Sequence, residues 1–319
     1  MSLAAVSSAG AILPNRRGLL GALSDYFWRR PGTLIFLMLL PAVLWLGIVY
    51  LGSLLALLLQ SFFSIDEFSG LVNREFTLKT YAELLRPQNL DIIIRTVLMA
   101  ASVTLASAVV AFPIAYVAAR YARGHWKALF YLGIMLPLWA SYLVKVYAWK
   151  LILAREGILN WVFEQLHLTW LLDAWLAMPV IGGNSLSISY TGTFLVFLYV
   201  WMPYMILPIQ AAIERVPVNL LDASSDLGAT PRQTFWKVIF PLALPGVIAG
   251  SIFTFSLTLG DYIIPQIVGN SQFFIGQAVY SHQGTAGNIP LAAAFTVVPI
   301  VIMGIYLTLA KRAGAFDAL

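Results

Sequence analysis

Long uncharged stretches alternate along this chain with short segments that carry its charged residues. A helix that crosses the hydrocarbon core of a membrane needs about 20 predominantly apolar residues. Six uncharged stretches approach or exceed this length: residues 34–65, 96–119, 128–144, 193–213, 241–260 and 290–310. The third is followed by Lys145 and Lys150, past which the span can continue. The pattern predicts an all-α, polytopic membrane protein with about six transmembrane helices.

A seventh apolar stretch, residues 161–181, differs from the others because it contains Glu164 and Asp173. Two acidic side chains within one span would be costly to place in hydrocarbon. Tryptophan prefers the headgroup region, and this stretch has three: Trp161, Trp170 and Trp175. We expect an interfacial or re-entrant helix here rather than a seventh span.

The N-terminal tail has no apolar run longer than six residues, which is too short for a cleavable signal. Residues 16–30 combine arginines with leucines and aromatic residues, a composition typical of an amphipathic helix on a membrane surface. Pro31 and Gly32 would end that helix. The sequence therefore predicts a cytoplasmic tail with an interfacial helix, residues 1–33, and a six-span membrane domain, residues 34–319.

Composition and charge agree with a membrane protein and orient it. Hydrophobic residues make up 60% of the sequence and charged residues 10%, whereas soluble domains average about 25% charged residues. The net charge of +5 is compatible with nucleic-acid binding, but the cations are placed as in a membrane protein. With both termini inside, the inner segments carry 12 Lys and Arg residues, and the longer outer segments carry 7. We predict cytoplasmic termini, contact with membrane lipid and no nucleic-acid partner.

Several kinds of catalytic and metal-binding site are not encoded in the sequence. The chain has no cysteine, which excludes disulfides and cysteine-ligated metals. It has no P-loop, H-E-x-x-H or G-x-S-x-G motif. The three histidines, His125, His167 and His282, are far apart, so roles in loops or at the interface are favoured over a metal site. We predict a non-catalytic chain that binds no metal and no cofactor of its own.

The most informative segment is residues 216–240, between the fourth and fifth predicted spans. Asn219 can cap a first short helix, with Asp222 at the capping-box spacing. Gly228 can end that helix in a left-handed conformation. The spacing therefore predicts a short helix that stops at a glycine hinge.

A second short helix is predicted after Thr230, which can cap it, with Pro231 at the first position, where a missing N–H is harmless. Pro241 and Pro245 would then bend the chain into the membrane. The apolar side of the segment carries four residues: Leu221, Phe235, Val238 and Ile239. Physical chemistry alone leaves two interpretations, a plain amphipathic connector or a rigid, exposed elbow on the cytoplasmic face.

This segment closely resembles the E-A-A-x-x-x-G loop of ABC-importer permeases, which forms a coupling helix that docks in a groove of the ATP-hydrolysing subunit. The resemblance gives Asp222 the acidic position and Gly228 the turn, and it makes Phe235 the docking aromatic residue. It departs from the family pattern where Asp replaces Glu and where Ser224 replaces the second alanine. The residues implied in coupling to the ATPase are Asp222, Ala223, Ser224, Asp226, Gly228, Ala229, Thr230, Pro231, Phe235 and Pro241.

Residues 137–149, 199–208 and 260–265 resemble the permeases of the spermidine/putrescine type. The resemblance covers nearly the whole chain and implies a six-span permease of the type I importer kind in the bacterial cytoplasmic (inner) membrane. It implies three partners: a second homologous permease subunit, a P-loop ATPase dimer that uses ATP and magnesium, and an extracytoplasmic substrate-binding protein. It also implies a polyamine, such as spermidine or putrescine, as the substrate.

An acid and several aromatic residues are candidates for the substrate path. Asp261 directly follows the fifth predicted span, where an unpaired carboxylate is costly unless it has a function. Aromatic faces attract ammonium groups. The candidates are Asp261, Tyr147, Trp149, Trp201, Tyr204 and Tyr262. The alternatives are a water-exposed acid at the end of a span and aromatic side chains that only pack between helices or lie at the interface.

Two rival functions are also compatible with the sequence. An importer permease of this kind can serve another small solute, such as an opine, an amino-acid derivative, a sugar phosphate, thiamine or ferric ion. A secondary transporter driven by an ion gradient would suit six spans equally well. It would, however, leave the elbow at residues 217–240 without a partner.

Overall fold

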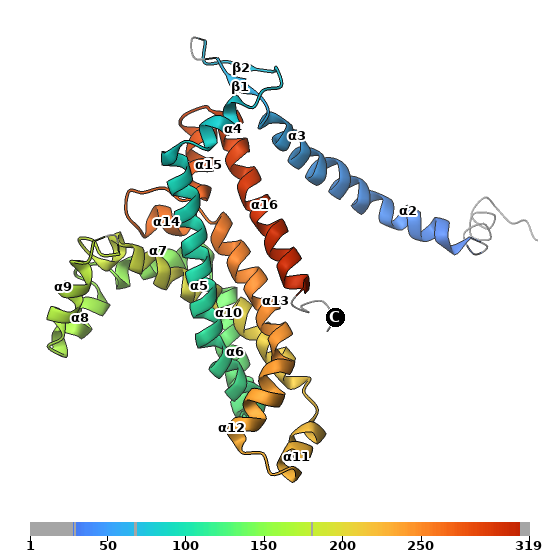
Figure 1. Ribbon diagram of the computed structural model, residues 1–319, viewed down its shortest axis with the longest axis vertical. Helices are drawn as coiled ribbons and strands as arrows, with labels where there is room; N and C mark the ends of the chain where they lie inside the picture. The colour runs from blue at the N-terminus through green and yellow to red at the C-terminus, as the bar shows by residue number, and fades with distance from the viewer. Residues whose placement is uncertain (1–27, 29, 67–68, 180, 313–319) are drawn as a thin grey trace, which may run out of the picture. The chain divides into compact units, whose positions relative to one another are not determined.

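The computed structural model describes residues 28, 30–66, 69–179 and 181–312. The described residues are mainly α-helical and belong to two units, residues 1–57 and residues 58–319, each of which is considered by itself (Figure 1). The amphipathic helix predicted in the N-terminal tail falls almost entirely outside the described residues.

The first unit contains one long apolar helix. It comprises α2 (Pro31–Leu44), the π-helical segment η1 (Trp45–Leu51) and α3 (Gly52–Gln60), whose last residues belong to the second unit. Residues 32–60 form a helix of 29 residues. At 1.5 Å per residue this helix is about 43 Å long, which exceeds the hydrocarbon thickness of about 30 Å. It accounts for the first predicted span.

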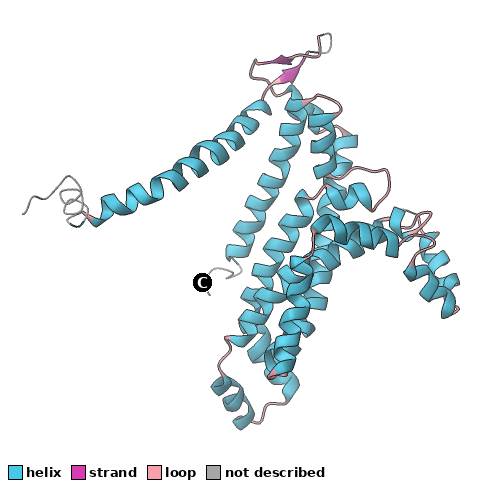
Figure 2. Ribbon diagram, turned by 180° about the vertical axis from the view of Figure 1, so that it is seen from behind, coloured by secondary structure: helices cyan, strands magenta, loops and turns pink. Residues whose placement is uncertain are grey.

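Long helices pack together at the centre of the second unit (Figure 2). They are α5 (Pro87–Arg120), α10 (Tyr190–Glu214), α13 (Phe240–Gly260) and α16 (Ile289–Arg312). Helix α10 has its most extensive contacts with α13 and α5, and these two helices also contact each other. On α5, the small residues Ala111, Ala115 and Ala118 are fully buried. A shared core of α5, α10 and α13 therefore holds the unit together.

Helices α10 and α13 approach closely because α13 has glycines at their contact. A Cβ atom on Gly246 would lie 2.6 Å from the carbonyl oxygen of Pro208 and 2.5 Å from the Cβ atom of Ala212. A Cβ atom on Gly250, one turn later, would lie 2.8 Å from the sulfur of Met205. Helices in a membrane associate without a hydrophobic driving force. Small residues four apart let their backbones approach closely, and van der Waals packing then stabilises the pair.

The remaining elements are shorter. They are β1 (Ser64–Ile65), β2 (Val72–Asn73), α4 (Lys79–Leu84), α6 (His125–Trp139), α7 (Tyr142–Ile152), α8 (Ile158–Gln165), α9 (Thr169–Leu176), the 3-10 helix η2 (Leu186–Ile188), α11 (Val218–Asp226), α12 (Pro231–Thr234), the π-helical segment η3 (Phe235–Ile239), α14 (Ile263–Ile267) and α15 (Ile275–Gly284). Strands β1 and β2 pair antiparallel, with Ser64 opposite Asn73. Helices α4 and α15 pack against α16.

Five helices among the described residues are long and apolar enough to cross a membrane: residues 32–60, 87–120, 190–214, 231–260 and 289–312. They correspond to five of the six predicted spans. The prediction of a continuous helix over residues 128–144 is wrong, because α6 and α7 meet at an angle of 97°. Ala140 and Ser141, between the two helices, have extended backbones. The count of six spans holds when this bent pair is taken as one span.

The stretch predicted not to span, residues 161–181, contains no long helix. Helices α8 and α9 have eight residues each, so each is about 12 Å long and too short to cross. His167 lies between them with a positive φ of 54°. The side chains of Trp161, Trp170 and Trp175 are exposed. The choice between an interfacial and a re-entrant placement stays a prediction.

The packing of α13 on α10 predicts that Gly246→Ala destabilises the protein. The added methyl group would meet backbone atoms of α10, and overpacking of this kind costs about 1–3 kcal/mol. Gly304 on α16 is the matched control, because nothing lies within 4 Å of its Cβ position. Gly304→Ala should be neutral or slightly stabilising. The measurement is the midpoint of thermal unfolding in detergent, followed by size-exclusion chromatography; equal midpoints for the two variants would contradict the packing account.

Candidate functional site

Helices α11 and α12 form an elbow at one end of the bundle (Figure 1). Helix α11 begins directly after Pro217, whose backbone is extended and which occupies the N-cap position. Asn219 therefore lies inside the first turn, and the prediction that its side chain caps the helix is wrong. The proline starts the helix earlier because it supplies a suitable φ at a position where no N–H is needed.

The turn of the elbow has the predicted glycine geometry. Gly228 has a φ of +74°, and its N–H donates to the carbonyl of Ser225 at 2.9 Å. The N–H of Ala229 donates to the carbonyl of Ser224 at 3.1 Å. Nothing lies within 4 Å of a Cβ atom at Gly228, so the requirement for glycine is conformational rather than steric. The predicted left-handed end of the first helix is confirmed.

The start of α12 is also as predicted, with Thr230 at the N-cap and Pro231 at the first position. The Thr230 hydroxyl accepts from the N–H of Gln233 at 3.4 Å, and the Thr230 N–H donates to the Gln233 side chain at 2.8 Å. This is a capping box, whose T-x-x-Q signal is present in the sequence at residues 230–233, although only the Thr230 cap was predicted. The hydroxyls of Ser224 and Thr234 lie 2.9 Å apart and join the two arms of the elbow.

Pro241 and Pro245, predicted to bend the chain into the membrane, lie within a continuous helix and do not interrupt it. Helices α12, η3 and α13 follow one another without a break, as one helix of 30 residues from Pro231 to Gly260. The widened turns of η3 precede Pro241, and the N–H of Phe240 donates to the carbonyl of Phe235. A π-helical turn of this kind accommodates a proline without breaking the helix.

Phe235, which the resemblance makes the docking aromatic residue, is half-buried and packs against α5. Its ring centroid lies 5.6 Å from those of Phe112 and Tyr116 on α5. The neighbouring Trp236 is 55% exposed, and Leu227 at the turn is 88% exposed. The aromatic and aliphatic groups available on the surface of the elbow are therefore residues that the sequence analysis did not single out.

The other residues that the resemblance implied lie on or near this surface. Asp222, Ala223 and Asp226 of α11 are exposed, and Ser224 and Ala229 are half-buried. Helix α11 thus presents two carboxylates and a small residue to its surroundings, next to the exposed Leu227.

Ionic and polar contacts hold the base of the elbow to α5 and α6. Glu214, the last residue of α10, forms an ion pair of 3.0 Å with Lys127 and accepts a hydrogen bond of 3.1 Å from the Tyr131 hydroxyl. The Arg120 guanidinium, at the end of α5, donates to the carbonyl of Val216 at 3.2 Å. Two of the cations that indicated an inner loop in the sequence therefore also anchor the segment that leads into α11.

A second cluster surrounds Asp261, which follows the end of α13. The Tyr142 hydroxyl, from α7, donates to the Asp261 carboxylate. The other carboxylate oxygen accepts from the N–H groups of Ile263 at 2.8 Å and Ile264 at 3.1 Å, and so caps α14. Asp261 is half-buried and has three donors, which argues against a water-exposed acid at the end of a span.

Aromatic rings extend this cluster into α10. Tyr142 stacks on Trp201, with centroids 5.9 Å apart and planes 19° apart, and Trp201 contacts Tyr204 at 5.8 Å. Trp201 is only 9% exposed, and its indole N–H has no hydrogen-bond partner. We call Tyr142, Trp201, Tyr204 and Asp261 the aromatic layer. Tyr142 was not among the residues selected from the sequence, because nothing in the sequence shows that it reaches Asp261.

The other three aromatic candidates lie outside the aromatic layer. Tyr147 is exposed on α7. Trp149 packs against Tyr199 at 5.2 Å, and Tyr262 stacks on Tyr280 of α15 at 5.1 Å. The structure therefore brings together only part of the predicted substrate path.

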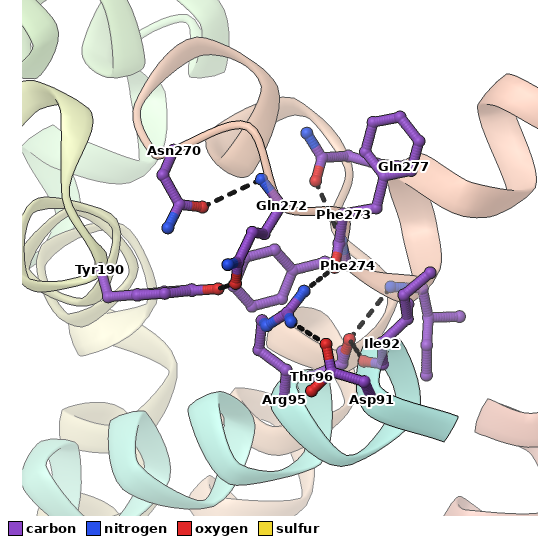
Figure 3. A network of polar contacts seen from close by, with 11 residues as sticks. Asp91, Ile92, Arg95, Thr96, Tyr190, Asn270, Gln272, Phe273, Phe274 and Gln277 are labelled. Atoms are coloured by element: carbon purple, nitrogen blue, oxygen red, sulfur yellow. Dashed lines mark hydrogen bonds and ion pairs between the residues drawn. The ribbon is translucent and has the colours of Figure 1, made fainter. Parts of the chain in front are cut away.

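A polar network ties the loop between α14 and α15 to the beginning of α5 (Figure 3). Arg95 pairs with Asp91, donates to the carbonyl of Phe273 at 3.1 Å, and lies 5.9 Å from the centroid of the Tyr190 ring. Thr96 accepts from the N–H of Ile275 at 3.0 Å. Beside this network is a cleft of about 990 Å³ with Asp91, Arg95, Tyr190, Asn270 and Gln272 in its wall. The sequence offered no signal for it, since Arg95 and Phe273 are 178 residues apart.

The three histidines lie apart from one another. His125 and His167 are exposed, on α6 and between α8 and α9. His282 stacks on Phe295 with centroids 5.7 Å apart, and burial lowers the pKa of its imidazole. A neutral ring that packs on an aromatic neighbour is the role that these contacts support for His282.

Comparison with known proteins agrees with the resemblance seen in the sequence. A profile of the family described as "Binding-protein-dependent transport system inner membrane component" matches residues 16–314. The chain is 57% identical over 306 residues to the inner membrane ABC transporter permease protein YdcU of Escherichia coli strain K12, covering 96% of this chain and 97% of that one. It is 28% identical over 279 residues to the spermidine/putrescine transport system permease protein PotB of the same organism, covering 86% and 96%.

Among solved structures, a similar chain occurs in a bacterial ABC transporter involved in the import of the acidic polysaccharide alginate. The TM-score is 0.65 at 17% identity, and the match covers 91% of this chain and 99% of that chain. The expected fold of a type I importer permease is thus confirmed. Because the family profile covers most of the sequence, this multi-span chain belongs to the binding-protein-dependent transport system inner membrane components.

Proposed function

We propose that this chain is a non-catalytic permease subunit of an ATP-driven importer and that its elbow, residues 217–240, receives the ATPase subunit. Family membership supports the first part. The second part depends on one observation: the elbow is stiffened from within and exposes large apolar side chains beside its carboxylates. The left-handed turn, the capping box and the Ser224–Thr234 contact fix its shape. Leu227 and Trp236 remain exposed.

The partners follow from this proposal. A P-loop ATPase dimer would bind ATP and magnesium, and the present chain would bind neither. A second homologous permease subunit would complete the translocation path. The elbow would face the cytoplasm, which the cations Arg120 and Lys127 at its base support. Both termini would then be cytoplasmic.

The opposite end of the bundle would receive an extracytoplasmic binding protein. The structure of the alginate transporter in complex with a periplasmic protein, whose permease chain has the same fold, is the precedent for such an arrangement. The cleft beside Arg95 lies near the first residues of α5, whereas the elbow is anchored to the last residue of that helix. The two proposed contact regions are therefore at different ends of α5.

We propose a polyamine or a similar small cation as the solute. The name of the PotB relatives supports this class, and the aromatic layer contains the matching chemistry of one carboxylate and several π faces. Trp201 is largely buried, so a solute would reach its ring only when the layer opens. The alternatives of an opine, an amino-acid derivative, thiamine or ferric ion have no comparable observation in their favour. The family match also disfavours a carrier driven by an ion gradient.

Neighbouring aromatic residues of the elbow should respond differently to truncation. Trp236→Ala removes a largely exposed ring that contacts Phe235 and Phe240. It should abolish co-purification of the ATPase subunit and lower the thermal midpoint of the chain less than Phe235→Ala does. Phe235→Ala removes a ring that packs against α5, and it should lower the free energy of unfolding by about 2 kcal/mol. The measurements are an affinity pull-down from native membranes and thermal unfolding in detergent. Full retention of the ATPase by Trp236→Ala would count against docking at this surface.

Removal of the charge of Asp261 should impair polyamine uptake. In Asp261→Asn, the amide oxygen still accepts from the N–H groups of Ile263 and Ile264 at the start of α14. The change therefore mainly removes the negative charge. We expect uptake to fall about tenfold, the equivalent of one charge-assisted contact. Tyr142→Phe is the control, because it removes a hydrogen bond of the same carboxylate and keeps the charge; uptake should stay within about threefold.

The measurement for Asp261 is uptake of labelled spermidine into vesicles that contain the complete transporter and its binding protein. Thermal midpoints of both variants separate folding from function. Normal uptake by Asp261→Asn would remove the carboxylate from the proposed path.

A further inference from the structure

The break between α6 and α7 leaves carbonyl groups at the end of α6 without helical partners. Every α-helix ends with carbonyls that the helix itself cannot satisfy. Here the chain turns by 97° within an apolar segment, where water is scarce and unsatisfied backbone groups are costly. The N–H of Ala140 satisfies the carbonyl of Leu136 at 3.2 Å. The next carbonyl, that of Pro137, would need the N–H of Ser141 in a continuous helix, but the extended residues at the break have moved that group away.

Lys145 supplies the missing donor. Its ammonium group, which comes from the first turns of α7, donates to the carbonyl of Pro137 at 2.7 Å. The contact crosses the break and joins the end of one helix to the side of the next. A cation at a helix C-terminus is also favoured by the partial negative charge of the terminal carbonyls. This explains how a half-buried lysine is tolerated in an otherwise apolar stretch.

The same face of α7 reaches the aromatic layer. Tyr142 and Lys145 are three residues apart, which places their side chains on one side of the helix. Tyr142 donates to Asp261 and stacks on Trp201. A rotation of α7 about the break would therefore separate Tyr142 from Asp261 and uncover the face of Trp201.

We propose that Lys145 is a positioning residue that holds the α6–α7 break as a hinge and thereby sets the closed state of the aromatic layer. The hinge goes beyond the proposed import function; its importance for transport rests on the proposal that the layer lines the solute path. Interrupted helices at which backbone carbonyls meet charged groups are a general means of building a movable site inside a membrane.

The experiment measures the geometry of the hinge directly. The chain has no cysteine, so spin labels attach only to cysteines that are introduced. One replaces the exposed Leu132 on α6 and the other the exposed Leu151 on α7, which puts one label on each side of the break. The complete transporter, with cysteine-free partner subunits, is reconstituted in nanodiscs, and the distance between labels is measured by pulsed electron paramagnetic resonance. The parent should give one narrow distance distribution.

Lys145→Met keeps the unbranched side chain up to the Cε position and removes the ammonium donor. We expect a distribution that broadens or shifts by about 5 Å, the rise of one helical turn. Lys145→Arg restores a cationic donor and should recover the parental distribution. Lys150→Met is the matched control, because Lys150 is exposed on the same helix; it should change nothing. If Lys145→Met does not assemble, Lys145→Gln tests the same contact with a neutral donor and should give an intermediate distribution.

A parental distribution in Lys145→Met would overturn the hinge. If only Lys145→Gln assembles, a parental distribution in that variant would overturn it. The distances do not depend on which solute is carried. If the distance between the labels changes in Lys145→Met but the transporter does not respond to polyamine, the hinge stands and the solute assignment is refuted. If the distance is unchanged but Asp261→Asn shows an uptake defect, the hinge is refuted and the solute assignment stands.

Discussion

Backbone N–H and C=O groups in an apolar segment must find partners within the protein, because lipid offers none. The long helices meet this requirement internally, and the informative places are those where a helix is interrupted. At the end of α6, Lys145 donates to the carbonyl of Pro137. After α13, Asp261 accepts from the N–H groups that open α14. Before Pro241, which has no N–H to donate, the π-helical segment η3 pairs the N–H of Phe240 with the carbonyl of Phe235.

These local solutions also position residues that the proposed function uses. The carboxylate of Asp261 caps a helix and at the same time receives the Tyr142 hydroxyl, which aligns Tyr142 with Trp201. The helix that continues through Pro241 starts at the elbow, so a displacement of the elbow acts directly on α13. At Gly246, α13 packs closely against the backbone of α10. One continuous helix therefore leads from the elbow to the close contact of α13 with α10.

The sequence predicted those parts of the structure that depend on local chemistry. Five spans follow from uncharged runs, and the turn at Gly228 and the cap at Thr230 follow from residue types at fixed offsets. The bend at Ala140 was not predicted, because a hydrophobic run reports burial in lipid and carries no information on direction. The predicted start of α11 at Asn219 was wrong because Pro217 occupies the N-cap position.

The candidate site could be predicted only in part, for the same reason. Phe235 and Trp236 are adjacent and both aromatic, and only the position of α5 determines which of them faces inward. The partnership of Tyr142 and Asp261 joins residues 119 positions apart, and one sequence does not contain that information. Long-range pairs of this kind define the aromatic layer and the network around Arg95, whereas the elbow is largely local.

The central claim is that the elbow is the surface on which the ATPase subunit docks. It is tested most directly by a photo-crosslinking amino acid at Leu227, the residue at the turn that is 88% exposed. The chain is expressed with its native partners, irradiated in intact membranes, and its crosslinked products are identified by mass spectrometry. The account predicts one major adduct, to a P-loop ATPase, that is absent when the probe replaces Leu105 on the apolar face of α5. Adducts to lipid alone, or no adduct from Leu227 in an assembled transporter, would contradict it.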